Sequence, residues 1–91
     1  MSDYLFIYIL KSLYSKCESN DEGIYSMLAI QVEEYILWLE CSQDVFSKHY
    51  NKYLRVLNTC YSLLHFHRDM GYIKDYINDS IAIFYIGMED D

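Results

Sequence analysis

The histidines and cysteines are the side chains best suited to bind a metal, but their spacing does not bring them together. His65 and His67 are two residues apart, which puts them on nearly opposite sides of a helix. Cys60 and His67 share a face, yet they are seven residues apart. Two helical turns are too far for one ion, or for a nucleophile and its base. We therefore expect no metal, no cofactor and no catalytic cysteine.

Other arrangements that resemble catalytic groups are also unconvincing. Glu33 and Glu34 are adjacent, so on a helix they diverge by about 100° and serve solvation better than shared acid–base work. His67, Arg68 and Asp69 match the letters of a kinase catalytic loop, but no Gly-rich phosphate loop accompanies them. Neither G-x-S-x-G nor H-E-x-x-H occurs in the sequence. We predict that the protein is not an enzyme.

The charge distribution is more informative. The net charge is −7, and no lysine or arginine lies between Lys16 and Lys48. That segment carries Glu18, Asp21, Glu22, Glu33, Glu34, Glu40 and Asp44. From Lys48 to Lys74 basic residues predominate. An acidic field repels phosphate and attracts basic surfaces, so we expect no nucleic-acid binding and a basic protein partner. The alternative is that the acidic residues only keep a tyrosine-rich bundle soluble.

The composition predicts one folded domain. Its 91 residues are 53% hydrophobic and 18% aromatic, which excludes a disordered chain. We assign residues 1–87 to a single helical domain and residues 88–91 to an acidic tail. Eleven tyrosines are too many to bury with every hydroxyl bonded, so several should lie at the surface. Tyrosine is enriched at protein interfaces, although a compositional bias of the genome explains the count equally well.

Cysteine usage and the apolar run near the start indicate where the protein resides. Three cysteines cannot all pair within one chain, which favours free thiols in a reducing compartment. The apolar run from Tyr4 to Leu10 is far shorter than the roughly twenty residues of a membrane span, and it lacks a basic signal-peptide region. We therefore expect a soluble, cytoplasmic protein that does not interact with membranes.

The longest periodic segment predicts a central helix at about residues 43–69, with Ser42 as its N-cap and Gly71 ending it. Its apolar stripe repeats in steps of four and three, the pattern of packed helices. The stripe consists of Phe46, Tyr50, Tyr53, Leu57, Cys60, Leu64 and His67. Close to its start, His49 is expected to be a half-buried packing histidine.

Two further helices are predicted before it. The first covers Asp3–Cys17 with Ser2 as N-cap, although the run Tyr4–Leu10 alone also fits a buried strand. Its inward residues are Leu5, Phe6, Ile9, Leu10, Leu13 and Cys17. The second covers about residues 21–40, introduced by an S-x-x-E capping box at Ser19 and Glu22. Its expected inward residues are Ile24, Met27, Leu28, Gln31, Tyr35, Trp38 and Leu39.

The last segment, residues 72–86, fits either a fourth helix or a β-hairpin turning at Asn78-Asp79. As a helix it would bury Ile73, Tyr76, Ile77, Ser80, Ile81 and Phe84. The predicted fold class is thus all-α, a small bundle of three to four helices around a long central helix.

A partner-binding surface is predicted on the outward face of the second helix. Glu33, Leu37 and Glu40 recur at four and three residues and form its centre. Around them we place Ile30, Asp44 and Glu22. Apolar anchors ringed by charge are typical of tight interfaces.

These features suggest an inhibitor of the immunity or antitoxin type, which would cover the cationic cleft of a nuclease toxin. Small acidic helical proteins of bacteria and phages use this format. The alternative is a viral helical-bundle protein that modulates a host factor or self-associates, as a homodimer for example, through apolar faces. A small subunit of a larger assembly is a third class. The sequence identifies neither the partner nor the source.

Overall fold

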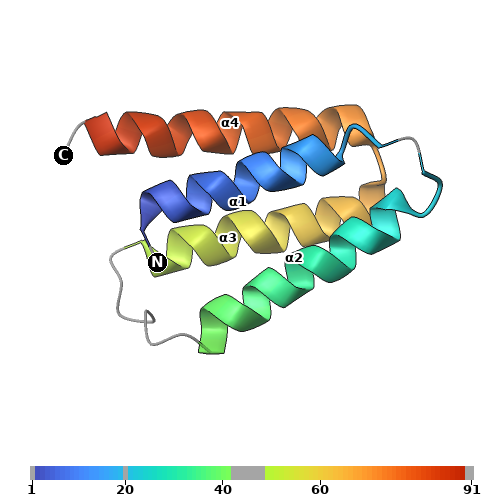
Figure 1. Ribbon diagram of the computed structural model, residues 1–91, viewed down its shortest axis with the longest axis horizontal. Coiled ribbons are helices and arrows are strands. Elements are labelled where there is room, and N and C mark those ends of the chain that lie inside the picture. The colour runs from blue at the N-terminus through green and yellow to red at the C-terminus, as the bar shows by residue number, and fades with distance from the viewer. Residues whose placement is uncertain (1, 20, 42–48, 90–91) are drawn as a thin grey trace.

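The computed structural model describes residues 2–19, 21–41 and 49–89. They form four α-helices, α1 (Asp3–Lys16), α2 (Ile24–Cys41), α3 (Tyr50–Ser62) and α4 (Met70–Glu89), as Figure 1 shows. A π-helical turn, η2 (Leu63–His67), continues α3. The described residues contain no strand, so the all-α prediction is confirmed and the hairpin alternative for residues 72–86 is wrong.

The helices pack as two pairs: one joins the first and last helices of the chain, and the other joins two consecutive helices. α1 packs on α4, and α2 packs on α3 and η2 (Figure 1). The shortest dimension of the molecule is 18 Å. Helices pack about 8–10 Å apart, so this thickness corresponds to roughly two layers of helix.

Three aromatic rings join the two pairs. Phe6 of α1 stacks on Tyr53 of α3, with ring centroids 4.5 Å apart. Phe84 of α4 lies 5.0 Å from Phe6 and 5.6 Å from Tyr53. All three rings are buried. Such clusters contribute about 0.5–1.5 kcal/mol per pair beyond the area they bury, so they hold α1, α3 and α4 together.

The start of α1 agrees with its prediction, because the Ser2 hydroxyl accepts a hydrogen bond from the Leu5 amide at 3.2 Å. The predicted inward face needs one correction. Leu5 is 42% exposed, whereas Ile7 is buried. α1 is covered by α4 on one side and α3 on another, so its buried arc is wide and rotated relative to the prediction.

The predicted capping box does not form, and α2 begins three residues later than expected. The Ser19 hydroxyl accepts from the Asp21 amide at 3.3 Å, and the Asp21 carboxylate accepts from the Gly23 amide at 3.0 Å. The Ile24 amide then donates to the Asp21 carbonyl. Two successive side-chain turns replace the reciprocal cap, because serine and aspartate side chains compete for nearby backbone amides.

The central helix is confirmed in its middle and corrected at its end. Its predicted stripe is buried at Tyr53, Leu57, Cys60 and Leu64, but His67 is exposed. The wide turn η2 changes the helical phase, because the Arg68 amide donates to the Leu63 carbonyl five residues back. Residues 42–48, with the predicted cap Ser42 and the stripe residue Phe46, lie outside the described residues.

The helix ends at Arg68 and not at Gly71. Arg68 adopts the left-handed conformation with φ 47°, and it is the one non-glycine residue with positive φ in the described chain. Gly71 instead lies in the first turn of α4. The Asp69 carboxylate accepts from the Tyr72 amide at 3.2 Å, so Asp69 caps α4 and the helix starts directly after it.

α4 buries Ile73, Ile77, Ser80, Ile81 and Phe84 as predicted, with Tyr76 partly buried. It runs to Glu89, so residues 88 and 89 of the expected acidic tail are helical, and Met88 packs against the core. None of the helices in the described part of the chain is long and apolar enough to cross a membrane.

Candidate functional site

α2 exposes apolar side chains on the side opposite its core contacts. Met27, Ile30, Leu37 and Trp38 are each 50–59% exposed. With the carboxylates of Glu33, Glu34 and Glu40, they define what we call the α2 outer face. The buried residues of the helix are Ile24, Leu28, Ala29, Val32 and Leu39. Because α2 is apolar on both sides, its outer face has the character of a surface that another molecule covers.

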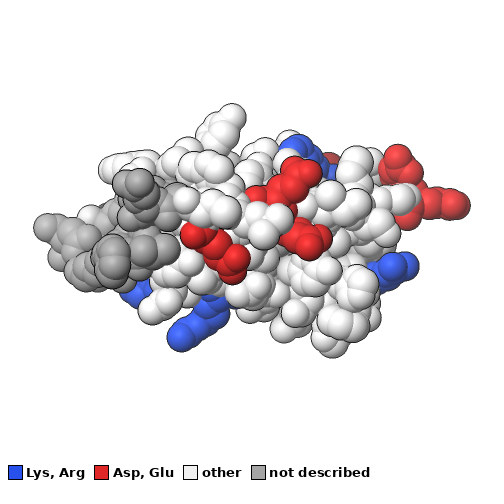
Figure 2. Space-filling model, turned by 90° about the horizontal axis from the view of Figure 1, so that it is seen from below, with Lys and Arg blue, Asp and Glu red and all other residues white. Residues whose placement is uncertain are grey.

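The carboxylates of this face are available to a partner. Glu33, Glu34 and Glu40 are exposed, and none of them takes part in an ion pair with another described residue. Figure 2 shows acidic side chains gathered in the middle of the side on which α2 lies, with basic side chains only toward its edges. The field over the apolar stripe is therefore negative and locally uncompensated.

A hollow beside Leu37 gives the face a concave feature. It has a volume of about 260 Å³ and lies between α2 and α3. Its lining residues are Glu33, Ile36, Leu37, Asn58 and Tyr61. The hollow thus combines an apolar wall, a phenol ring and one carboxylate. These groups suit the aliphatic stem and the charged head of a lysine or arginine side chain.

The structure brings together four of the six predicted site residues. Ile30, Glu33, Leu37 and Glu40 lie on the α2 outer face as expected. Glu22 is exposed in the turn that precedes α2, so it belongs to the opposite end of the helix from Glu40. Asp44 lies outside the described residues.

Two residues of the site were placed on the wrong side by the sequence prediction. Met27 and Trp38 were expected to face inward, but they are 51% and 50% exposed. Apolar residues occur all around α2, so amphipathicity gives no sharp direction for its core. The signal that finds them is spacing, because Met27, Ile30, Leu37 and Trp38 fall at i, i+3, i+10 and i+11, within one arc of about 100°.

A second polar cluster joins the start of α1 to the start of α3. The Tyr53 hydroxyl donates to the Asp3 carboxylate, whose oxygens lie 2.9 and 3.0 Å from Nδ1 of His49. Burial, and then this hydrogen bond, raise the pKa of Tyr53 above its ordinary value. His49 is half-buried as predicted and lies edge-on to the Tyr53 ring. The cluster satisfies the buried phenol and ties two helices together.

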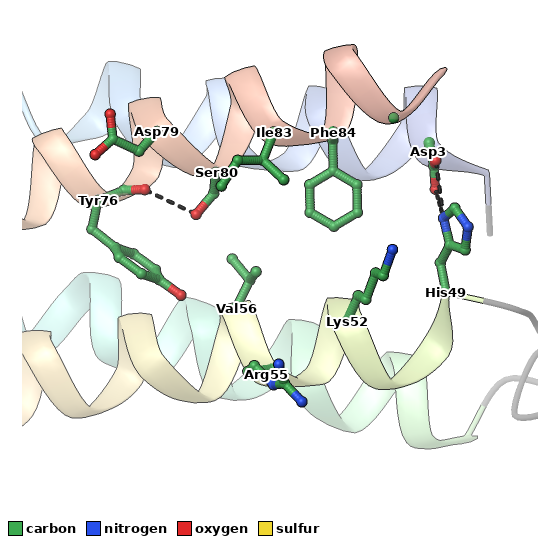
Figure 3. A pocket seen from close by; sticks show the side chains of 11 residues that line it. Asp3, His49, Lys52, Arg55, Val56, Tyr76, Asp79, Ser80, Ile83 and Phe84 are labelled. Carbon is green, nitrogen blue, oxygen red and sulfur yellow. Dashed lines mark hydrogen bonds and ion pairs between the residues drawn. The ribbon is translucent and has the colours of Figure 1, made fainter. Parts of the chain in front are cut away.

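This cluster does not form a nucleophile–base pair. His49 and Ser80 both line a groove between α3 and α4, but the Ser80 hydroxyl donates to the Tyr76 carbonyl at 2.9 Å. Figure 3 shows His49 and Ser80 separated along the groove, with Phe84 lying between them. Within the described residues, no three histidine, cysteine or acidic side chains are grouped closely enough to bind a metal ion.

The three cysteines are free thiols. Cys17 and Cys60 are buried, and burial raises the pKa of both, that of Cys60 to about 12. A thiol with a raised pKa is a poor nucleophile, so neither is suited to catalysis. Cys41, at the end of α2, is exposed.

Comparisons of the chain with protein-family models, curated proteins and solved structures found no match.

Proposed function

We propose that this protein is an interaction module whose α2 outer face binds a basic protein. The observation that carries the proposal is the pairing of exposed Ile30, Leu37 and Trp38 with three carboxylates that lack a partner among the described residues. Apolar area supplies affinity, and a one-signed field accelerates the encounter with a partner of opposite charge.

The hollow beside Leu37 suggests how the partner is anchored. A lysine or arginine side chain of the partner would lay its stem against Leu37 and Tyr61 and direct its charge to Glu33. Trp38 and Ile30 would flank this contact and exclude water from it. An aromatic and aliphatic centre surrounded by charge is the arrangement found at interaction hot spots.

Within this class we favour an inhibitor of the immunity or antitoxin type that neutralises a nuclease toxin in the cytoplasm. A nuclease cleft must be positive to hold phosphate, so an acidic surface complements it. In such a role the protein needs no catalytic group of its own.

The experiment is capture of the partner from the native cell with the tagged chain, followed by measurement of binding kinetics. Leu37→Ala should weaken binding by about 1–2 kcal/mol if Leu37 is an anchor. The double variant Glu33→Lys/Glu40→Lys should slow association and reduce its dependence on salt. Asp75→Lys reverses one exposed acid on α4, away from α2; it is the control for a charge reversal elsewhere and should leave the kinetics near the parent's. Unchanged binding by the double variant would refute the proposal.

The alternative is a viral bundle protein that binds host helices or self-associates through apolar surface. Exposed Tyr4, Tyr8 and Ile86 on α1 and α4 favour it. Binding through such apolar surface should hardly respond to ionic strength, whereas binding through the α2 outer face should weaken as salt rises.

A further inference from the structure

A groove of about 470 Å³ opens between α3 and α4, away from the α2 outer face. Figure 3 shows α3 forming one wall and α4 the other, with the Asp3–His49 pair closing one end. The volume lies within the range of small-molecule sites, roughly 300–1,000 Å³. We call this feature the α3–α4 groove.

The space between α3 and α4 is not filled because α4 packs mainly on α1 and contacts α3 much less. Phe84 and Val56 form its apolar floor, and Ile83 stands at its edge with 67% of its surface exposed. The wall of α4 is thus apolar where no other helix of the described chain covers it. An apolar chain lying against Val56, Ile83 and Phe84 would remove this surface from water.

Two cations border the same groove. Lys52 and Arg55 are three residues apart on α3, both are exposed, and neither is paired with a described acidic residue. Other lysines do have partners: Lys74 pairs with Glu18 at 2.7 Å, and Lys11 donates to the Tyr85 hydroxyl at 2.7 Å. In a chain of net charge −7, two adjacent unpaired cations mark a local site for an anion.

The acidic residues of the groove do not cancel this preference. Asp3 is engaged by His49 and by the Tyr53 hydroxyl. Figure 3 shows the Asp79 carboxylate on the side of α4 that faces away from α3, while Lys52 reaches into the space between the helices. A ligand in the groove therefore meets the ammonium group of Lys52 before it meets a free carboxylate.

We propose that the α3–α4 groove binds one molecule of an amphiphilic carboxylate that has a single alkyl chain. The alkyl chain lies against Val56, Ile83 and Phe84, and the carboxylate pairs with Lys52, which reaches between the helices (Figure 3). In Figure 3, Arg55 lies on the side of α3 away from α4, and it adds positive charge at the border of the groove. The volume argues for a chain rather than a docked helix. A three-turn helix, about 16 Å long and 10–12 Å wide with its side chains, occupies on the order of 1,500 Å³.

The test uses decanoate below its micelle concentration, with calorimetry for affinity and methyl NMR for location. Decanoate should bind with one-to-one stoichiometry and shift the methyl signals of Val56 and Ile83. The variant Lys52→Gln/Arg55→Gln should weaken binding about tenfold or more, the effect of one charge-assisted hydrogen bond. Lys16→Gln, an exposed lysine at the end of α1, is the control and should bind as the parent does.

Decanol tests the role of the charge and should bind at least tenfold more weakly than decanoate. The proposal is overturned if decanoate shows no saturable binding, if decanol binds equally well, or if the double variant retains full affinity. It is also overturned if signals shift only above the micelle concentration. Sedimentation of the parent and of Lys52→Gln/Arg55→Gln provides a further test. If the parent is a dimer and the double variant is a monomer, the groove is an interface between two copies of the chain and the proposal is overturned. Circular dichroism of the variants establishes that they are folded.

Discussion

Two leucines nine residues apart on α2 provide the most direct test of its orientation. Leu28 is 1% exposed and belongs to the core, whereas Leu37 is 54% exposed on the α2 outer face. Replacing either leucine with alanine changes the helix propensity of α2 by the same amount, so the comparison isolates burial.

The two substitutions should differ severalfold in effect. Leu28→Ala removes buried methyl groups and leaves a cavity, which costs about 2–5 kcal/mol of unfolding free energy. Leu37→Ala changes an exposed position, which typically alters stability by within about 0.5 kcal/mol. In a domain of this size 1 kcal/mol corresponds to about 4–8 °C in Tm, so Leu28→Ala should lower Tm by about 8–40 °C and Leu37→Ala by less than about 4 °C.

Thermal unfolding followed by circular dichroism, with urea titrations as an independent measure, tests whether Leu28 is buried and Leu37 is exposed. Equal Tm shifts for the two variants, or a larger one for Leu37→Ala, would mean that the α2 outer face is part of the core. In that case α2 is rotated relative to the structure, and the binding proposal fails with it. The same Leu37→Ala protein then serves in the partner-binding measurement, since its fold is preserved.

Three further results are expected. Gly71→Ala should raise the free energy of unfolding by about 0.5–1 kcal/mol, measured by urea titration, because Gly71 lies in a helix. The added Cβ would meet its nearest neighbour at 3.5 Å, which is an ordinary contact distance. A loss of stability would instead indicate that Gly71 has a left-handed backbone conformation. Stability should fall as pH rises from 9 toward 12, by up to about 1.4 kcal/mol per pH unit from Cys60 alone. Burial raises the pKa of this thiol from 9.0 to about 12, so the unfolded state loses its proton first, and Cys60→Ala should flatten the profile in alkaline unfolding titrations. Iodoacetamide at neutral pH should modify exposed Cys41 in the native protein and reach Cys17 and Cys60 only after unfolding, as mass spectrometry of the adducts would show; rapid native labelling of Cys17 or Cys60 would contradict their burial.

The fold was largely predictable because the buried residues repeat at helical spacing. Tyr53, Leu57, Cys60 and Leu64 were placed in the core from periodicity alone, and the serine at position 2 was recognisable as a cap. Periodicity is a local property of the chain, so it survives without knowledge of the neighbouring helices.

The face that each helix turns toward the core, and the residues at which helices begin and end, were harder to predict because they depend on contacts between helices. A π-helical turn moved His67 out of the core, and Asp69 capped α4 ahead of Gly71. On α2, Trp38 was assigned inward because it falls at helical spacing with Ile24, Leu28 and Leu39. The candidate surface was found in part, through Leu37 and Glu33, while the α3–α4 groove was not foreseen, since it is created by how two helices pack.

The pairing of α1 with α4 and of α2 with α3 also sets an order of assembly. Eight residues (42–49) connect α2 to α3, whereas 53 residues (17–69) separate α1 from α4. In an otherwise unfolded chain, loop-closure entropy makes the pairing of α1 with α4 about 1.7 kcal/mol costlier than the pairing of α2 with α3. Much of that difference disappears once α2 and α3 have paired. The α2–α3 pair should therefore form early, with α1 and α4 docking onto it late. The α2 outer face would then exist in the folding chain before the α3–α4 groove does, and substitutions between α1 and α4 should mainly accelerate unfolding.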